Sequence, residues 1–153
     1  MPSYIDVVKH VGSDVPFFIN KQPATISGIG ENVVNLNDTQ PIKIIIAVPK
    51  KGLSTKEIFE KYDEMKPKDT EKYYWNGISL FNDLWNTSVE IYPELNTIKQ
   101  NLEDRYNKNF FMSGSGSALF SLFEENEEIE EIDSEEFNLK YFSITKKIDC
   151  SFS

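Results

Sequence analysis

The chain has 153 residues and a net charge of −9, from 16 Lys and Arg against 25 Asp and Glu. Its length fits one domain with a hydrophobic core, and its charge argues against a nonspecific nucleic-acid or anionic-membrane binder, because each needs a basic surface. The single cysteine, Cys150, cannot form an internal disulfide, and the longest apolar run, residues 44–48, is too short to span a bilayer, so we expect a cytoplasmic protein.

The N-terminal residues predict a short amphipathic helix followed by a stiff turn. Gly12 is suited to ending the helix, and Pro16 restricts the residue before it to an extended backbone. Asp14 therefore stands on a rigid bend next to an apolar segment. Its carboxylate fits a general base in a partly desolvated pocket, and it also fits an Asp that binds local backbone N–H groups in a turn. The apolar helix positions are Tyr4, Val7, Val8 and Val11.

The next segments predict strands and one helix. Residues 24–28 and 31–36 resemble a hairpin around two glycines, and the β-branched run 43–48 predicts a buried strand. Ser54 and Glu57 form a capping box, from which we expect a helix to about residue 65. Its apolar face would carry Ile58, Phe59 and Tyr62.

The middle of the chain predicts an aromatic loop and two helices. Residues 73–75 are three adjacent aromatics, which fit either a lid or contact surface or packing beneath a long loop. Asn82 is a candidate N-cap for the next helix. Pro93 is suited to the first position of another helix, which extends to about Tyr106.

Residues 113–117 alternate serine and glycine between two apolar runs. Such a bare backbone can turn several N–H groups toward one point and bind a phosphate. It also fits a flexible connection between two strands. The Walker A pattern requires a Lys after the glycines, and none follows here, so a phosphate loop in this chain would belong to another class.

The C-terminal third predicts two strands, at 118–123 and 139–148, around an acidic segment at 124–136. We expect a short solvated helix in that acidic segment. It lacks the spacing of a calcium loop, so we expect no metal site there. The order of elements predicts an α+β fold, with an antiparallel or mixed sheet and helices packed on one face.

Four motifs then follow one another along the chain. They comprise residues 12–18 with 28–31, 48–49 with 53–55, 82–84 with 92–94, and 112–117. This ordered set resembles the 4-diphosphocytidyl-2-C-methyl-D-erythritol kinases of the galactokinase, homoserine kinase, mevalonate kinase and phosphomevalonate kinase superfamily. The resemblance implies a transferase that uses ATP and Mg²⁺ to phosphorylate the 2-hydroxyl of a cytidine diphosphate substrate, in the non-mevalonate route to isoprenoid precursors.

The resemblance also implies roles for individual residues. Asp14 matches the catalytic aspartate that takes the proton from the attacking hydroxyl. Thr55 and Phe59 match positions that line the cytidine pocket, although Phe59 also fits ordinary core packing. The phosphate loop would comprise Ser113, Gly114, Ser115 and Gly116.

The family's N-terminal half carries a Lys-Ile-Asn-like substrate motif and the main Gly-rich ATP loop, and neither is found in this chain. By resemblance, residues 1–19 are a remnant of the N-terminal kinase domain and residues 20–153 are the C-terminal domain. We therefore expect the chain to be inactive alone, with the missing half, or a second copy bound through the first helix, as partner. The alternative is a non-catalytic remnant that binds a nucleotide or a partner protein.

Overall fold

The computed structural model describes residues 24–27, 32–35, 41–67, 70 and 72–146. The chain divides into two compact units, one of residues 1–41 with 148–153 and one of residues 42–147. In the first unit, β1 (Ala24–Ser27) pairs antiparallel with β2 (Asn32–Asn35), which confirms the expected strand pair. The predicted first helix, Asp14 and the expected domain boundary after residue 19 lie outside the described residues.

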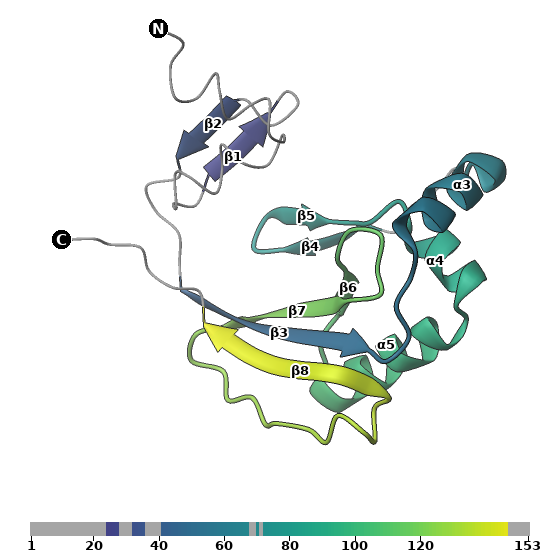
Figure 1. Cartoon of the computed structure of the whole chain (residues 1–153). Coiled ribbons are helices and arrows are strands. Elements are labelled where there is room, and N and C mark those ends of the chain that lie inside the picture. The colour runs from purple at the N-terminus through teal and green to yellow at the C-terminus, as the bar shows by residue number, and fades with distance from the viewer. Residues whose placement is uncertain (1–23, 28–31, 36–40, 68–69, 71, 147–153) are drawn as a thin grey trace, which may run out of the picture. The chain divides into compact units, whose positions relative to one another are not determined.

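The second unit contains a four-stranded antiparallel sheet with the strand order β6-β7-β3-β8 (Figure 1). The central strands are β3 (Ile42–Pro49) and β7 (Leu119–Glu124), and the edges are β6 (Phe111–Met112) and β8 (Leu139–Lys146). Alternate residues of β3 and β7 are fully buried, as expected where one sheet face supports a core. The strands predicted from the apolar runs are therefore confirmed.

The described residues form three helices, α3 (Thr55–Met65), α4 (Trp85–Ile91) and α5 (Glu94–Tyr106). α5 packs on that buried face, and Trp85 of α4 packs against the same core. Apolar residues of α5 and of the two central strands belong to one core cluster, which confirms the α+β prediction. No helix in the described part of the chain is both long and apolar enough to cross a membrane. The core includes Ile45, Ala47, Leu95, Ile98, Leu102, Leu119 and Phe123.

The aromatic segment is a strand and not a loop. β4 (Tyr73–Trp75) pairs with β5 (Ile78–Leu80), and Asn76 and Gly77 form the turn between them. Both turn residues have positive φ, at 46° and 79°, as a two-residue hairpin turn of this kind requires. The Asn-Gly pair is the sequence signal for this hairpin.

The acidic segment contains no helix, so the expectation of a solvated helix at 124–136 was wrong. Residues 127–133 run without regular structure and are held by cations from the folded body. Lys108 Nζ lies 2.7 Å from a carboxylate oxygen of Glu127, and Arg105 lies 2.6 Å from Glu130. Ile129 also packs against the core. Ion pairs and apolar contacts with the rest of the unit thus hold the acidic segment. In a helix, its neighbouring carboxylates would repel one another.

The pair of Lys108 and Glu127 predicts a pH-dependent stability. The hydrogen bond from Lys108 lowers the pKa of Glu127, and the bond from the backbone N–H of Glu124 lowers it further. The stabilisation is therefore present above the pKa of an unfolded Glu, about 4.3, and is lost as the pH falls through the lower pKa of the folded state. Lys108→Met should lower the free energy of unfolding at pH 7 by on the order of 0.5–1 kcal/mol.

Urea unfolding at pH 7 and pH 3 tests this expectation. The difference between Lys108→Met and the native chain should shrink at pH 3. Lys140→Met is the matched control, because it removes the same charge from an exposed position on β8. A loss that is equal at both pH values, or that the control reproduces, would contradict the assignment.

Candidate functional site

The Ser/Gly loop between β6 and β7 has a defined conformation. The backbone N–H of Ser113 donates to Ala118 O at 2.9 Å, and that of Gly116 donates to Ser113 O at 3.1 Å. Gly114 and Gly116 have positive φ, at 57° and 88°, and Ser115 between them is not among the residues with positive φ. Alternating handedness of successive residues is the backbone geometry of an anion-binding nest.

Two backbone donors of this loop have no acceptor within the described part of the chain. Among the residues that the structure describes, none accepts a hydrogen bond from the backbone N–H of Gly114 or of Ser115. Gly114 is exposed and Ser115 is half-buried, so both can reach a ligand from solvent. Accessible N–H groups that no protein acceptor uses can bind water or an anion, and in this loop they have the nest geometry, so this part of the loop is a candidate anion site.

The N-terminus of α3 meets the loop at the same place. The hydroxyl oxygens of Thr55 and Ser115 lie 2.9 Å apart, although 60 residues separate them in the chain. Thr55 is the first residue of α3, and the hydroxyl of Ser54 accepts a hydrogen bond from the backbone N–H of Glu57 at 3.4 Å, which confirms the expected N-cap. The partial positive charge of a helix N-terminus therefore adds to the field of the loop's N–H groups.

Phe59 lies one helical turn after Thr55 and is 51% exposed. The expectation that Ile58 and Phe59 share one buried face was wrong, because Ile58 is fully buried and Phe59 is not. Ordinary core packing therefore does not account for Phe59. An exposed ring at this position can stack on a planar ligand whose anionic group lies at the loop.

Two side chains hold the loop from the protein side. The hydroxyl of Ser117 donates to Lys51 O at 2.7 Å. The side-chain amide of Asn82 donates to Met112 O at 2.8 Å and to Gly114 O at 2.9 Å. Asn82 is not the predicted N-cap of α4: its Oδ1 accepts from Leu84 N at 2.9 Å, but the helix begins later, at Trp85, with Leu84 as its N-cap.

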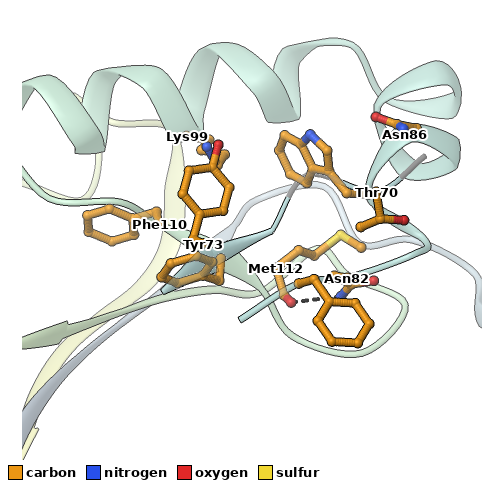
Figure 2. A pocket seen from close by; sticks show the side chains of 10 residues that line it. Thr70, Tyr73, Asn82, Asn86, Lys99, Phe110 and Met112 are labelled. Atoms are coloured by element: carbon orange, nitrogen blue, oxygen red, sulfur yellow. Dashed lines mark hydrogen bonds between the residues drawn. The ribbon is translucent and has the colours of Figure 1, made fainter. Parts of the chain in front are cut away.

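A small pocket lies beneath this part of the fold, and Figure 2 shows its lining side chains. Lys99 reaches into it, 2.7 Å from Glu103 Oε1 and against the rings of Tyr73 and Trp85. The cavity volume is about 40 Å³, room for about one water and far below the roughly 300 Å³ of a typical ligand pocket. We therefore place the candidate site at the loop and α3 and not in this pocket.

The described residues offer no obvious metal ligands. No group of three or more His, Cys, Asp or Glu side chains gathers among them in a geometry suited to a metal ion. The predicted catalytic residue, Asp14, lies outside the described residues. The structure thus brings together Thr55 and the predicted phosphate loop, with Phe59 on the same helix, and Asp14 stays a prediction.

Comparison with known proteins gives one consistent family. Residues 74–135 match the family described as GHMP kinases C terminal. A relative called 4-diphosphocytidyl-2-C-methyl-D-erythritol kinase, from Protochlamydia amoebophila, is 36% identical over 114 residues, which cover 73% of this chain and 40% of that protein. A relative of the same name from Clostridium acetobutylicum is 33% identical over 149 residues, covering 90% of this chain and 50% of the relative.

The fold has a solved counterpart as well. A crystal structure of 4-(cytidine 5'-diphospho)-2C-methyl-D-erythritol kinase superposes with a TM-score of 0.56 and 24% identity, over 79% of this chain and 49% of that one. This likeness supports the fold. The chain spans half or less of the length of the two relatives described above.

The loop conformation predicts a graded response to alanine. A Cβ atom on Gly116 would lie 2.8 Å from Met112 Sδ and 3.0 Å from Leu53 Cδ1, in a backbone with φ of 88°. Gly116→Ala should therefore destabilise the chain by about 1–3 kcal/mol. Gly114→Ala, strained in φ but free of close contacts, should cost less. Gly52→Ala, which has neither problem, is the control; equal urea-unfolding curves for Gly116→Ala and Gly52→Ala would contradict the loop structure.

Proposed function

Because the chain carries a GHMP kinase C-terminal domain, we propose that it is the C-terminal part of an ATP-dependent kinase that phosphorylates the 2-hydroxyl of 4-diphosphocytidyl-2-C-methyl-D-erythritol. The GHMP kinase C-terminal domain is supported by the comparisons, and the α+β fold by the structure and its solved counterpart. The substrate, and the place in the non-mevalonate route to isoprenoid precursors, are our proposal from the names of the relatives.

One observation carries the proposal: the 2.9 Å contact between the hydroxyls of Thr55 and Ser115. This contact connects the Ser/Gly loop, which has two free N–H groups, to α3, which carries the exposed ring of Phe59. A nucleoside diphosphate has the matching chemistry, with an anionic end for the N–H groups and a planar base for Phe59. The site needs no basic side chain for this, which is consistent with a chain of net charge −9.

The remaining roles are proposed from the family. Asp14 would accept the proton of the attacking hydroxyl, as the resemblance implies. The free N–H groups of Gly114 and Ser115 also fit a phosphate of ATP, which supplies the transferred phosphoryl group when it is bound. Since the described residues hold no cluster of metal ligands, we assign no side chain here to Mg²⁺.

A non-catalytic binding module is the second candidate, favoured by the fact that the chain spans only 40–50% of its two relatives' length. Such a module would bind a nucleotide or a partner protein, so nucleotide binding alone does not separate the two candidates. They differ when the N-terminal half of a relative is supplied as a separate chain.

The first prediction concerns binding of cytidine diphosphate. Phe59→Ala should weaken binding roughly tenfold or more, because stacking of a base on an aromatic ring is worth about 1–3 kcal/mol. Its effect on the unfolding free energy should be small, since the ring is exposed. Isothermal titration calorimetry measures the affinity, and Tyr141→Ala, on β8 and 53% exposed, is the matched aromatic control. Equal weakening by both variants, or no binding by the native chain, would refute this site.

The second prediction concerns turnover. The 153-residue chain alone should transfer no phosphate from ATP to the methylerythritol substrate, and addition of the N-terminal half of the Clostridium acetobutylicum relative should restore measurable transfer. Phosphate transfer is followed by phosphorus NMR. Turnover by the chain alone would disprove the predicted dependence on a second half, and binding without turnover in the mixture would favour the non-catalytic module.

A further inference from the structure

Asn82 lies between β5 and α4, and its side chain contacts the Ser/Gly loop 30 residues further along the chain. We propose that Asn82 is the positioning residue that holds residues 113–116 in their anion-binding conformation. This inference rests on the proposed function, because it assigns a cause to the geometry of the same site. It concerns a residue that would touch neither substrate nor the reacting atoms.

The hydrogen bonds of Asn82 determine the orientation of its amide. Both side-chain N–H groups are used, one by Met112 O and one by Gly114 O, while Oδ1 accepts from Leu84 N. An amide has two donors on one atom and an acceptor on the other. Asp could keep the acceptor but would set a carboxylate against two carbonyl oxygens, and an apolar residue of similar size would lose all three bonds.

The bond to Gly114 O has a direct consequence for the free donors. The peptide between Gly114 and Ser115 is trans, so its C=O and N–H point in opposite directions. When Asn82 draws Gly114 O toward the protein, the N–H of Ser115 must turn away from it. That N–H is one of the two donors with no acceptor among the described residues. Asn82 also keeps a carbonyl oxygen, which would repel an anion, out of the nest.

The bond to Met112 O acts in the same way on the start of the loop. It holds the peptide between Met112 and Ser113, whose N–H then faces Ala118 O at 2.9 Å. Figure 2 shows Asn82 next to Met112 at the edge of the aromatic pocket. This is a rigid base for the amide, because Trp85 packs against the core and the neighbouring Asp83 accepts a hydrogen bond from the hydroxyl of Thr70.

Asn82→Asp in the full 153-residue chain tests the inference, with Asn101→Asp as the matched control. Asn101 is exposed on α5, so the control makes the same isosteric change and adds the same charge away from the loop. Amide hydrogen exchange by NMR is the first readout. We expect the N–H groups of Ser113 and Gly116 to exchange at least tenfold faster in Asn82→Asp, while those in the middle of β3 are unchanged and the control behaves like the native chain.

Titration with cytidine diphosphate is the second readout. At pH 7, Asn82→Asp should bind about tenfold more weakly than the native chain. At pH 5 part of this difference should disappear, because protonation of the introduced carboxyl group restores one O–H donor to the loop. Asn82→Ala, which has no group to protonate, should show no such recovery. A merely structural loss would give the two variants the same pH profile.

The outcomes separate the two proposals. If the loop amides exchange at native rates in Asn82→Asp, the positioning role is wrong whether or not a ligand binds. If they exchange faster but the native chain binds no cytidine diphosphate, the positioning role stands and the proposed function fails. Should Asn82→Asp not fold, Asn82→Ser, which keeps one hydroxyl donor, gives the same exchange comparison.

Discussion

The Ser/Gly loop takes its shape partly from the rest of the fold, because its residues carry nothing larger than a hydroxymethyl side chain. Two hydrogen bonds lie within the loop, and others join it to three other parts of the fold: Asn82 before α4 donates to it, Lys51 O after β3 accepts from Ser117, and Thr55 at the start of α3 shares a hydrogen bond with Ser115. β3 contributes residues to the core cluster, and Trp85 at the start of α4 packs against it. The pairing of β3 with β7 and the packing of α5 beneath them therefore also position two backbone N–H groups at the surface.

The arrangement would let an acidic chain present the proposed anion site. The field of 25 carboxylates is spread over the surface and screened by salt, whereas a nest and a helix N-terminus act on an anion in direct contact. The acidic segment is itself neutralised in part, because Lys108, Arg105 and Lys50 pair with Glu127, Glu130 and Glu135. In this proposal, local backbone geometry rather than net charge decides what the surface binds.

Much of the fold could be predicted from short-range patterns. The β-branched run of β3 and the Ser54 N-cap of α3 are local signals, and the structure follows both. The exposure of Phe59 could not be predicted in this way, because the spacing of apolar residues on a helix does not show which residues at the edge of the apolar face pack against another element. The acidic segment failed for a related reason, since its partners lie 19 to 85 residues away in sequence. The side-chain amide of Asn82 likewise donates to a loop 30 residues away, and only its local contact with Leu84 N could be expected from the sequence around it.

The central claim is that two loop N–H groups bind the diphosphate of a nucleotide. The most direct measurement is the proton and nitrogen chemical shift of the Gly114 and Ser115 amides during titration of the isotope-labelled chain with inorganic pyrophosphate, and then with cytidine diphosphate. Both amides should move downfield and saturate together with either ligand, and the ring signals of Phe59 should respond to the nucleotide alone. If the Gly114 and Ser115 amides stay in place while another surface titrates, the assigned site is wrong.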